Sequence, residues 1–458
     1  MAFETYIISW NITKRCNLRC SHCYLDASYL TPPFSPPLQP PLSPPFKGGE
    51  KGEVKRGEEG GDELSTEECF RLIDQMAQIN PNAVLILTGG EPLLRRDIFE
   101  ISKYASDKGF LTVLGTNGIP IAEGIAHKIK ESGIKGVGVS LDSLNAEKHD
   151  SFRGVKGAWE NTVKGIEEIK KAGIEFQIQT TVTKGNYDEI PSIIEFAYKI
   201  GARVFNLFFL VCTGRGEELT DISAEQYEDM LSYIYKIHDN FKGMMIRPKC
   251  APHFKRIAYQ SDPNSPVLSG YIGGCRAGTN YCRITPEGNV TACPYMPDAV
   301  GNVRDKNFVD IWWNSEMFKN LRHPEYHGKC QDCEYKLLCG GCRARALATN
   351  NDYMGDDSWC LYKPVEGEKK IINLETDIKY GLENEENPPS PPFDKGGDGG
   401  IVWTDEAIKF LENIPFFART IAKKGVEKHA KEMGYKTITM ETMKEAREKR
   451  AGKMRFKI

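Results

Sequence analysis

The stretch Cys16-Asn17-Leu18-Arg19-Cys20-Ser21-His22-Cys23-Tyr24 decides how the chain is organised. It follows a short apolar segment at residues 6–10 that is typical of a strand, and it places three cysteines within eight residues. Closely spaced thiolates on a loop commonly hold a [4Fe–4S] cluster, and three ligands for four irons leave one iron open to a small molecule. A zinc ion would need a fourth ligand, and the next residues supply no Cys or His.

The order Cys-x3-Cys-x2-Cys, with His22 before the third cysteine, resembles the signature of the radical S-adenosylmethionine (SAM) enzymes. The resemblance implies that Cys16, Cys20 and Cys23 hold a [4Fe–4S] cluster and that SAM binds its open iron. Such enzymes split SAM with one electron, and the resulting 5′-deoxyadenosyl radical removes hydrogen from an unactivated carbon. The resemblance also implies an electron donor such as flavodoxin or ferredoxin.

The composition indicates a large protein that keeps its thiols reduced. The chain has 458 residues, 14 cysteines and a formal net charge of -3. This charge balance argues against a general nucleic-acid-binding protein, and no apolar run is long enough for a membrane span. Because the first residues lack the pattern of a signal peptide, we expect a cytoplasmic protein whose cysteines bind metal.

Two low-complexity segments divide the chain. Both are rich in Pro, Gly and charged residues, and both contain the tetrapeptide Ser-Pro-Pro-Phe. Such segments bury too little apolar surface to fold. We therefore predict a first domain at residues 1–30 and 63–245, a disordered insert at 31–62, a cysteine-rich domain at 246–365, a linker at 366–400 and a small helical domain at 401–458.

Apolar runs alternate with amphipathic helical patterns through the first domain. The predicted strands are 6–10, 83–88, 111–115, 136–141, 175–182 and 203–210, and the predicted helices are 66–79, 98–108, 121–132, 158–172 and 189–200. Repeated β/α units predict an α/β fold with a parallel sheet and right-handed crossovers. An open doubly wound sheet and a barrel both fit this alternation. The resemblance to radical SAM enzymes implies their partial (β/α)6 barrel, with the site at the carboxyl ends of the strands.

Short polar motifs follow several of the predicted strands. Glycines let a backbone approach a ligand closely, and a carboxylate can pair with an ammonium group. The resemblance implies that Gly89, Gly90 and Glu91 bind the amino group of SAM, that Asn117, Ser140 and Asp142 serve its ribose and carboxylate side, and that Arg153 binds its carboxylate. As alternatives, Asn117 can belong to an ordinary turn and Asp142 can cap a helix.

A second set of cysteines lies between residues 275 and 360. Eight thiols are what two fully ligated [4Fe–4S] clusters require. The spacing of Cys275, Gly288 and Cys293 resembles the SPASM extension of radical SAM enzymes, and a structural zinc among residues 330–342 is the alternative. The resemblance implies two auxiliary clusters, one held by Cys275, Cys282, Cys293 and Cys342 and the other by Cys330, Cys333, Cys339 and Cys360.

Residues 208–216, 249–253 and 339–346 resemble the heme b synthases of the siroheme-dependent heme pathway. That family oxidatively decarboxylates two propionates of an iron porphyrin to vinyl groups, which implies a small-molecule substrate of the tetrapyrrole class. Arginines can clamp propionates, and a histidine can approach the porphyrin, but each can equally be a satisfied structural residue. The candidates are Arg215, His253, Arg343 and Arg345.

The segment 401–458 contains helix start and stop signals. It resembles the small domain of a light-independent protochlorophyllide reductase subunit, and we predict an all-α unit without catalytic residues. For the whole chain, two alternatives to a tetrapyrrole enzyme stay open. One is a peptide-modifying SPASM maturase, and the other is a non-catalytic iron–sulfur electron carrier, which would not cleave SAM.

Overall fold

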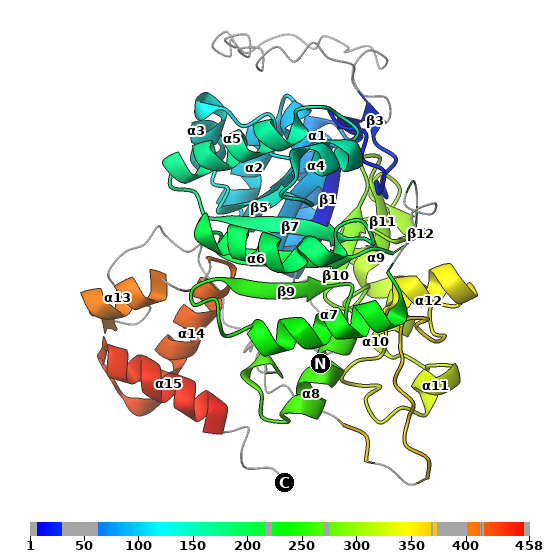
Figure 1. Ribbon diagram of the computed structural model, residues 1–458. Helices are drawn as coiled ribbons and strands as arrows, with labels where there is room; N and C mark the ends of the chain where they lie inside the picture. Colours follow the sequence, from blue (N-terminus) through cyan, green and yellow to red (C-terminus); the bar gives the residue numbers. More distant parts are fainter. Residues whose placement is uncertain are drawn as a thin grey trace.

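The computed structural model describes residues 7–29, 63–211, 213, 215, 222–268, 274–367, 370–372, 401–412, 414 and 416–452. The predicted insert at 31–62 and most of the predicted linker at 366–400 lie outside the described residues. The described part contains a ten-stranded sheet with helices around it and a small C-terminal unit (Figure 1).

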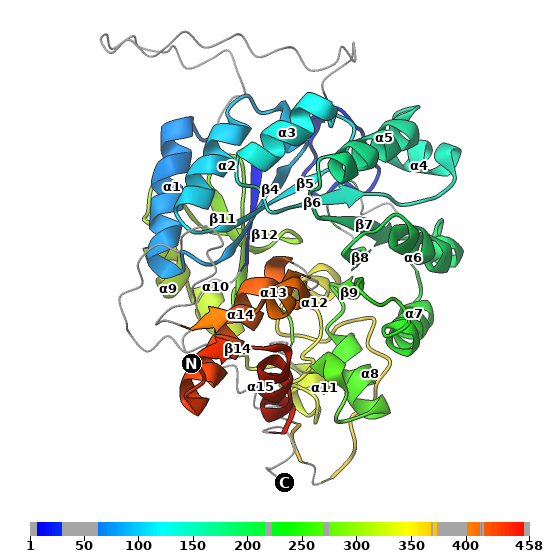
Figure 2. The ribbon, with the colours of Figure 1, turned by 90° about the vertical axis from the view of Figure 1, so that its left-hand side faces the viewer.

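Six neighbouring parallel strands, each followed by a helix, confirm the predicted partial barrel. Figure 2 shows their helices in an arc on the outside of the sheet. The strands are β1 (Ile7–Thr13), β4 (Val84–Gly89), β5 (Leu111–Thr116), β6 (Gly136–Ser140), β7 (Phe176–Val182) and β8 (Val204–Phe209). The helices are α1 (Thr66–Ile79), α2 (Ile98–Asp107), α3 (Glu123–Glu131), α4 (Ala146–Arg153), α5 (Ala158–Lys171), α6 (Ile190–Lys199) and α7 (Ala224–Ile237).

The strand register gives this sheet two chemically different faces. On β1, Ile8 and Trp10 are fully buried in the same core as Leu72 of α1, so this side is the outer, helix-covered face. Alternate residues of a strand point to the opposite side, which we call the inner face. By register, the inner face carries mainly polar residues and glycines, among them Ser9, Asn11, Thr88, Gly115, Gly138, Ser140, Gln177, Gln179 and Asn206, together with the apolar Ile86, Val113, Val204 and Phe208.

The sheet continues at both ends beyond the six predicted strands. β9 (Met245–Lys249) pairs in parallel with β8, and β10 (Tyr281–Ile284) pairs in parallel with β1. β11 (Asn289–Cys293) and β12 (Met296–Asn302) follow in antiparallel order. The cysteine-rich region therefore shares the sheet of the first domain, and β9 and β12 form the two open edges.

Short elements complete the cysteine-rich region and the loop after β1. They are β2 (Arg15–Cys16), β3 (Ser28–Tyr29), α8 (His253–Ser261), α9 (Phe308–Asn314), α10 (Glu316–Arg322), α11 (Gly328–Gln331) and α12 (Arg343–Asn350). Trp312 and Phe318 of α9 and α10 are fully buried and pack against each other edge to face. They extend the main core over the outer face of β10 to β12.

The C-terminal unit contains the predicted helices together with a short parallel strand pair that was not predicted. Its elements are β13 (Val402–Trp403), α13 (Asp405–Glu412), α14 (Phe416–Met433), β14 (Thr437–Ile438) and α15 (Met440–Gly452). Trp403 and Ile438 lie in a core of its own. Arg419 of this unit forms a 2.6 Å ion pair with Glu175, the residue before β7, which ties the unit to the amino ends of the strands.

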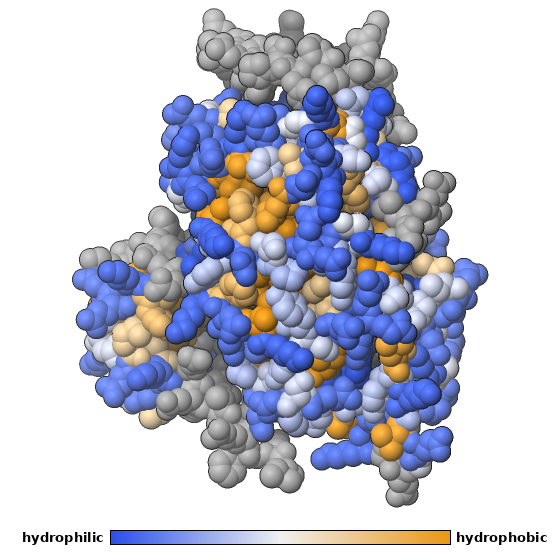
Figure 3. Space-filling model, in the orientation of Figure 1, coloured by the Kyte–Doolittle hydropathy of each residue, from blue (hydrophilic) through white to orange (hydrophobic). Residues whose placement is uncertain are grey.

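The surface is mostly polar on the side shown in Figure 3, where apolar residues form separate patches between charged ones. Among the described residues, no helix combines the length and apolar character that a membrane crossing requires.

Two helical glycines have very different surroundings and provide a matched test of the packing. A Cβ atom on Gly165 in α5 would come within 2.1 Å of the carbonyl oxygen of Gly118, in the loop after β5. A Cβ atom on Gly124 in α3 would meet nothing within 4 Å.

We expect Gly165→Ala to lower the free energy of unfolding by about 1–3 kcal/mol, because α5 has to move away from the loop. Gly124→Ala should leave this energy unchanged or raise it by up to about 1 kcal/mol, because alanine favours a helix. Denaturant unfolding followed by circular dichroism measures both. Equal stability of the two variants would contradict the close approach of α5.

Candidate functional site

Backbone hydrogen bonds from two different elements fix the cysteine loop after β1. The amide of Glu91, after β4, donates to the carbonyl oxygen of Arg15 at 2.8 Å. The amide of Arg19 donates to the carbonyl oxygen of Arg153, at the end of α4, at 3.0 Å. The loop conformation therefore depends on the barrel and not only on its own sequence.

The three thiols of this loop lie together. Cys16, Cys20 and Cys23 belong to one small apolar cluster with Leu18 and Ala158. Burial raises the pKa of Cys16 to about 12, and the charges of Cys20 and Cys23 raise it as well. Buried thiols that oppose one another's ionisation favour a cation that binds them as thiolates. The set therefore fits the cluster predicted from the sequence.

A buried cation lies beside this thiol set. Arg153 donates from Nε to Asp142 Oδ2 at 2.7 Å and from Nη1 to the sulfur of Cys20 at 3.6 Å. Burial raises the pKa of Cys20 and the charge of Arg153 lowers it. Burial also lowers the pKa of His22 to about 3, so this ring is neutral where it stacks on Phe152 at 4.3 Å. Arg153 thus places its positive charge next to a sulfur ligand.

Glu91 follows β4 and connects the end of β5 with the loop after β1. Its carboxylate accepts hydrogen bonds from Thr116 Oγ1 and from the amide of Asn117, all at 2.9 Å, and burial raises its pKa to about 7. Gly89 and Gly90 lie so close to the backbone of β1 and the cysteine loop that a Cβ atom would come within 2.4 and 2.2 Å of carbonyl oxygens. The Gly-Gly-Glu motif therefore supports the cysteine loop directly.

The remaining predicted SAM-binding residues line the same strand ends. Asn117 donates from Nδ2 to Oδ1 of Asn17, inside the cysteine loop, at 2.7 Å. Ser140 is half-buried at the end of β6. Asp142 is only 2% exposed and also accepts from the amide of Thr181 at 2.9 Å. The structure thus brings the predicted residues together around the loop, with Asp142 enclosed by protein partners.

Polar residues of the inner face that the sequence analysis missed lie beside them. A Cβ atom on Gly138 would come within 2.9 Å of the side-chain nitrogens of Gln177 and Gln179, so both glutamines lie over this glycine. Asn206 donates to Gln177 at 2.8 Å. The alternation Phe-Gln-Ile-Gln in β7 is the sequence signal that would have found them.

An aromatic contact connects the first thiol set with the second. The hydroxyl of Tyr24 accepts a hydrogen bond from Asn11 Nδ2 at 2.9 Å, and its ring meets that of Tyr295 edge to face at 5.6 Å. Burial raises the pKa of Tyr24, and the charges of Cys23 and Cys293 raise it further. Tyr24 therefore connects the loop of the first thiol set with Tyr295, which lies two residues after Cys293 of the second.

The cysteine-rich region forms two groups of thiols. In the first group, burial raises the pKa of Cys293, and the charges of Cys250, Cys275 and Cys342 raise it further. The second group consists of Cys330, Cys333, Cys339 and Cys360. Burial raises the pKa of all four, and the charge of Cys360 raises the pKa of the other three further.

The positions of two cysteines do not agree with the ligand sets that the resemblance implies. Cys250, for which the sequence analysis named no role, lies with Cys275, Cys293 and Cys342. Cys282 is fully buried in β10 in register with Ile8, on the outer face. The resemblance implied Cys282 as a ligand, whereas Cys250 is far from the other three cysteines in sequence and comes near them only through the fold.

The four residues considered for substrate binding all have protein partners. Arg215 donates to the carbonyl oxygen of Cys20 at 3.1 Å and to Asp26 at 2.8 Å. Each of the others is at most 3% exposed. Arg343 donates to the carbonyl oxygens of Tyr353 and Gly355, Arg345 forms an ion pair with Asp357, and His253 bonds to the hydroxyl of Tyr227. These contacts favour the structural alternative for all four.

The demands of an iron–sulfur cluster differ from those of a single metal ion. Within the described residues, no three Cys, His, Asp or Glu side chains are grouped to hold one ion. In a [4Fe–4S] cluster each iron takes its own thiolate, so the ligand sulfurs stand farther apart than around zinc. The two groups of buried, mutually repelling thiols in the cysteine-rich region fit ligands of that kind.

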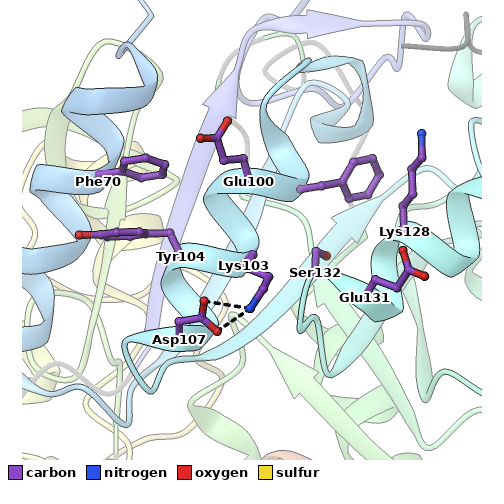
Figure 4. Close-up of a pocket in the computed structure, with 9 residues that line it drawn as sticks. Phe70, Glu100, Lys103, Tyr104, Asp107, Lys128, Glu131 and Ser132 are labelled. Atoms are coloured by element: carbon purple, nitrogen blue, oxygen red, sulfur yellow. Dashed lines mark hydrogen bonds and ion pairs between the residues drawn. The ribbon is translucent and has the colours of Figure 1, made fainter. Parts of the chain in front are cut away.

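A surface groove of about 600 Å³ lies elsewhere on the molecule, on the outer side of α1, α2 and α3 (Figure 4). Its lining includes the stacked rings of Phe70 and Tyr104 and the exposed ion pair of Lys103 with Asp107. No thiol lines the groove, and the helices separate it from the inner face. We assign no chemistry to it.

Three family models match the chain. The radical SAM superfamily matches residues 10–197, the iron–sulfur cluster-binding domain SPASM matches residues 275–334, and the proto-chlorophyllide reductase 57 kD subunit matches residues 403–447. The first match lies in the barrel, the second in the first part of the cysteine-rich region and the third in the C-terminal unit.

Curated relatives match most of the chain. The AdoMet-dependent heme synthase of Methanosarcina barkeri is 40% identical over 367 residues, which are 78% of this chain and 97% of that relative. The AdoMet-dependent heme synthase of Oleidesulfovibrio alaskensis is 37% identical over 369 residues, or 78% of this chain and 87% of that relative.

Solved structures share the fold. Streptococcus suis SuiB bound to the precursor peptide SuiA has a TM-score of 0.60 at 17% identity, over 79% of this chain and 76% of that one. The enzyme anSMEcpe with bound AdoMet has a TM-score of 0.57 at 18% identity, over 78% and 94%. The chain is therefore an enzyme of the radical SAM superfamily that uses SAM and iron–sulfur clusters, and it belongs to the SPASM-containing family that includes the AdoMet-dependent heme synthases.

Proposed function

We propose that the chain converts propionate side chains of an iron porphyrin to vinyl groups by oxidative decarboxylation. The observation that carries the proposal is the contact of Tyr24 with Tyr295, because Tyr24 follows Cys23 of the first thiol set and Tyr295 lies two residues after Cys293 of the second. The reaction needs two redox centres near one substrate. The similarity to heme synthases over nearly their whole length supports the choice of substrate.

The overall change removes a hydrogen atom from a propionate carbon, releases CO2 and one further electron, and leaves a carbon–carbon double bond. When bound, the cofactors supply the 5′-deoxyadenosyl radical that takes the hydrogen and the acceptor that takes the electron. A one-electron donor such as flavodoxin or ferredoxin would reduce the enzyme before each cleavage of SAM.

The chain's own residues would hold and orient these groups. Cys16, Cys20 and Cys23 would ligate three irons, and Arg153 would place its positive charge beside the sulfur of Cys20. The Gly-Gly-Glu motif, Asn117 and Ser140 lie at the strand ends around that loop, where SAM would bind. Asp142 would act by holding Arg153, because its carboxylate is enclosed by protein.

The first test is SAM cleavage. We expect reconstituted protein with SAM and dithionite to form 5′-deoxyadenosine, and we expect C16A, C20A and C23A each to lower this rate at least about 100-fold, because the cluster loses a ligand. Cys69→Ala is the control, since this buried thiol of α1 is separate from all three sets. Liquid chromatography measures the product. Normal turnover by a loop variant would remove the assignment of the loop.

The second test is substrate turnover. Anaerobic incubation with iron-coproporphyrin III, SAM and dithionite should give a vinyl-containing porphyrin and release CO2, because propionate is the group that is lost. Mass spectrometry of the porphyrin and trapping of labelled CO2 measure the products, and C16A serves as the inactive control. Formation of 5′-deoxyadenosine without either product would remove the tetrapyrrole substrate and favour a peptide substrate.

A further inference from the structure

Cys282 is positioned as a core residue. Ile8 and Cys282 are register partners on neighbouring strands, and both are fully buried on the outer face. Tyr281, the preceding residue, points to the opposite side, where burial and the charge of Cys293 raise its pKa. The sheet itself therefore separates the sulfur of Cys282 from Cys293.

Cys250 is held in an uncommon backbone conformation. It follows β9 and has a φ angle of 56°, in the left-handed region that residues other than glycine rarely adopt. Its carbonyl oxygen accepts a hydrogen bond from Nη2 of Arg345 at 3.2 Å. A strained backbone conformation of this kind persists where the surrounding structure stabilises it, and such residues are common at functional sites.

A buried network joins Cys250 to Cys342. Arg345, which is bonded to Cys250, also donates from Nε to Oδ1 of Asp357 at 2.6 Å. The other oxygen of Asp357 accepts a hydrogen bond from the amide of Cys342 at 2.7 Å. Arg345 and Asp357 are both at most 3% exposed, so a buried network links the backbone of Cys250 to that of Cys342.

The electrostatics agree with this geometry. Burial raises the pKa of Cys250, and the charges of Cys342 and Cys275 raise it further. For Cys282, burial is again the main cause of a raised pKa, but the neighbouring charge is the cation of Arg322 and no thiolate. Cys250 therefore faces other thiols, whereas Cys282 does not.

We propose that Cys250 completes an iron–sulfur cluster site with Cys275, Cys293 and Cys342, and that Cys282 is a core residue that binds no iron. The proposal rests on the iron–sulfur chemistry of the proposed function but not on its substrate. It reassigns one ligand of the auxiliary site that lies next to Tyr295 and so nearest to the cysteine loop.

With Cys250 as a ligand, the cluster would connect distant parts of the sheet. Cys250 follows β9, which is one open edge of the sheet, and Cys293 ends β11, which neighbours the strand at the other edge. A cluster held by both would join the two sides of the partial barrel. With Cys282 as the ligand in place of Cys250, no connection to β9 would form.

Iron content distinguishes the two ligand sets. The parent for this test is the full-length protein in which Cys16, Cys20 and Cys23 are replaced by alanine, so that all bound iron belongs to the auxiliary clusters. Two variants add C250A or C282A to this parent. The parent should bind about eight irons per chain and C282A the same, whereas C250A should lose between about one and four, because a site of three thiolates releases one iron or the whole cluster. Iron and sulfide assays measure this, and electron paramagnetic resonance detects a new [3Fe–4S] signal in C250A alone. Iron loss in C282A, or full iron content in C250A, would overturn the proposal.

Thermal stability provides an independent readout. Binding a cluster only in the folded state raises the unfolding temperature. We expect anaerobic reconstitution to raise this temperature equally in the parent and in C282A, and less in C250A, because only C250A loses the connection to β9. Differential scanning calorimetry of apo and reconstituted samples measures the shift. An equal gain in C250A and C282A would contradict the connection, and the apo samples show whether either substitution itself disturbs folding.

Discussion

Burial of thiols in convergent sets is the constraint on which the rest of the structure depends. A buried thiol gives up its proton only where a cation compensates the charge. Here burial and neighbouring thiolates raise the pKa of Cys16 and Cys293 alike. Since metal binding releases the proton of a thiol, we expect folding of these loops and assembly of the clusters to be coupled. The loop after β1 is also held by backbone hydrogen bonds to Glu91 and Arg153 of the barrel.

The sequence predicted the strands and helices of the barrel well, because apolar runs mark the strands and amphipathic patterns mark the helices. The six strands and the five predicted helices lie within a few residues of the predicted ranges, whereas α4 and α7 were not predicted. The addition of β9 to one edge and of β10 to β12 to the other was missed, because β9 is short and begins with an exposed Met245, and because pairing between β1 and β10 joins residues about 270 positions apart. No local pattern contains that information.

The site was predictable to the extent that its residues are close in sequence. The loop cysteines and the Gly-Gly-Glu motif are local signals, and the structure brings them together. Their environment was not predictable. Glu91 accepts hydrogen bonds from Thr116 and Asn117, and Arg345 is paired with Asp357, and no local sequence pattern contains these contacts. Cys250 was missed because its neighbours are brought to it by β9 and the Arg345 network.

The parallel strands also separate the functions of the chain in space. The cysteine loop, the Gly-Gly-Glu motif and Cys250 all follow the carboxyl ends of strands, whereas the C-terminal unit is tied by Arg419 to Glu175 at an amino end. Figure 1 shows this unit on the side away from the cysteine loop. Parallel strands keep their two ends apart. The ion pair therefore places this contact between the unit and the barrel at the end of the strands opposite to the cysteine loop.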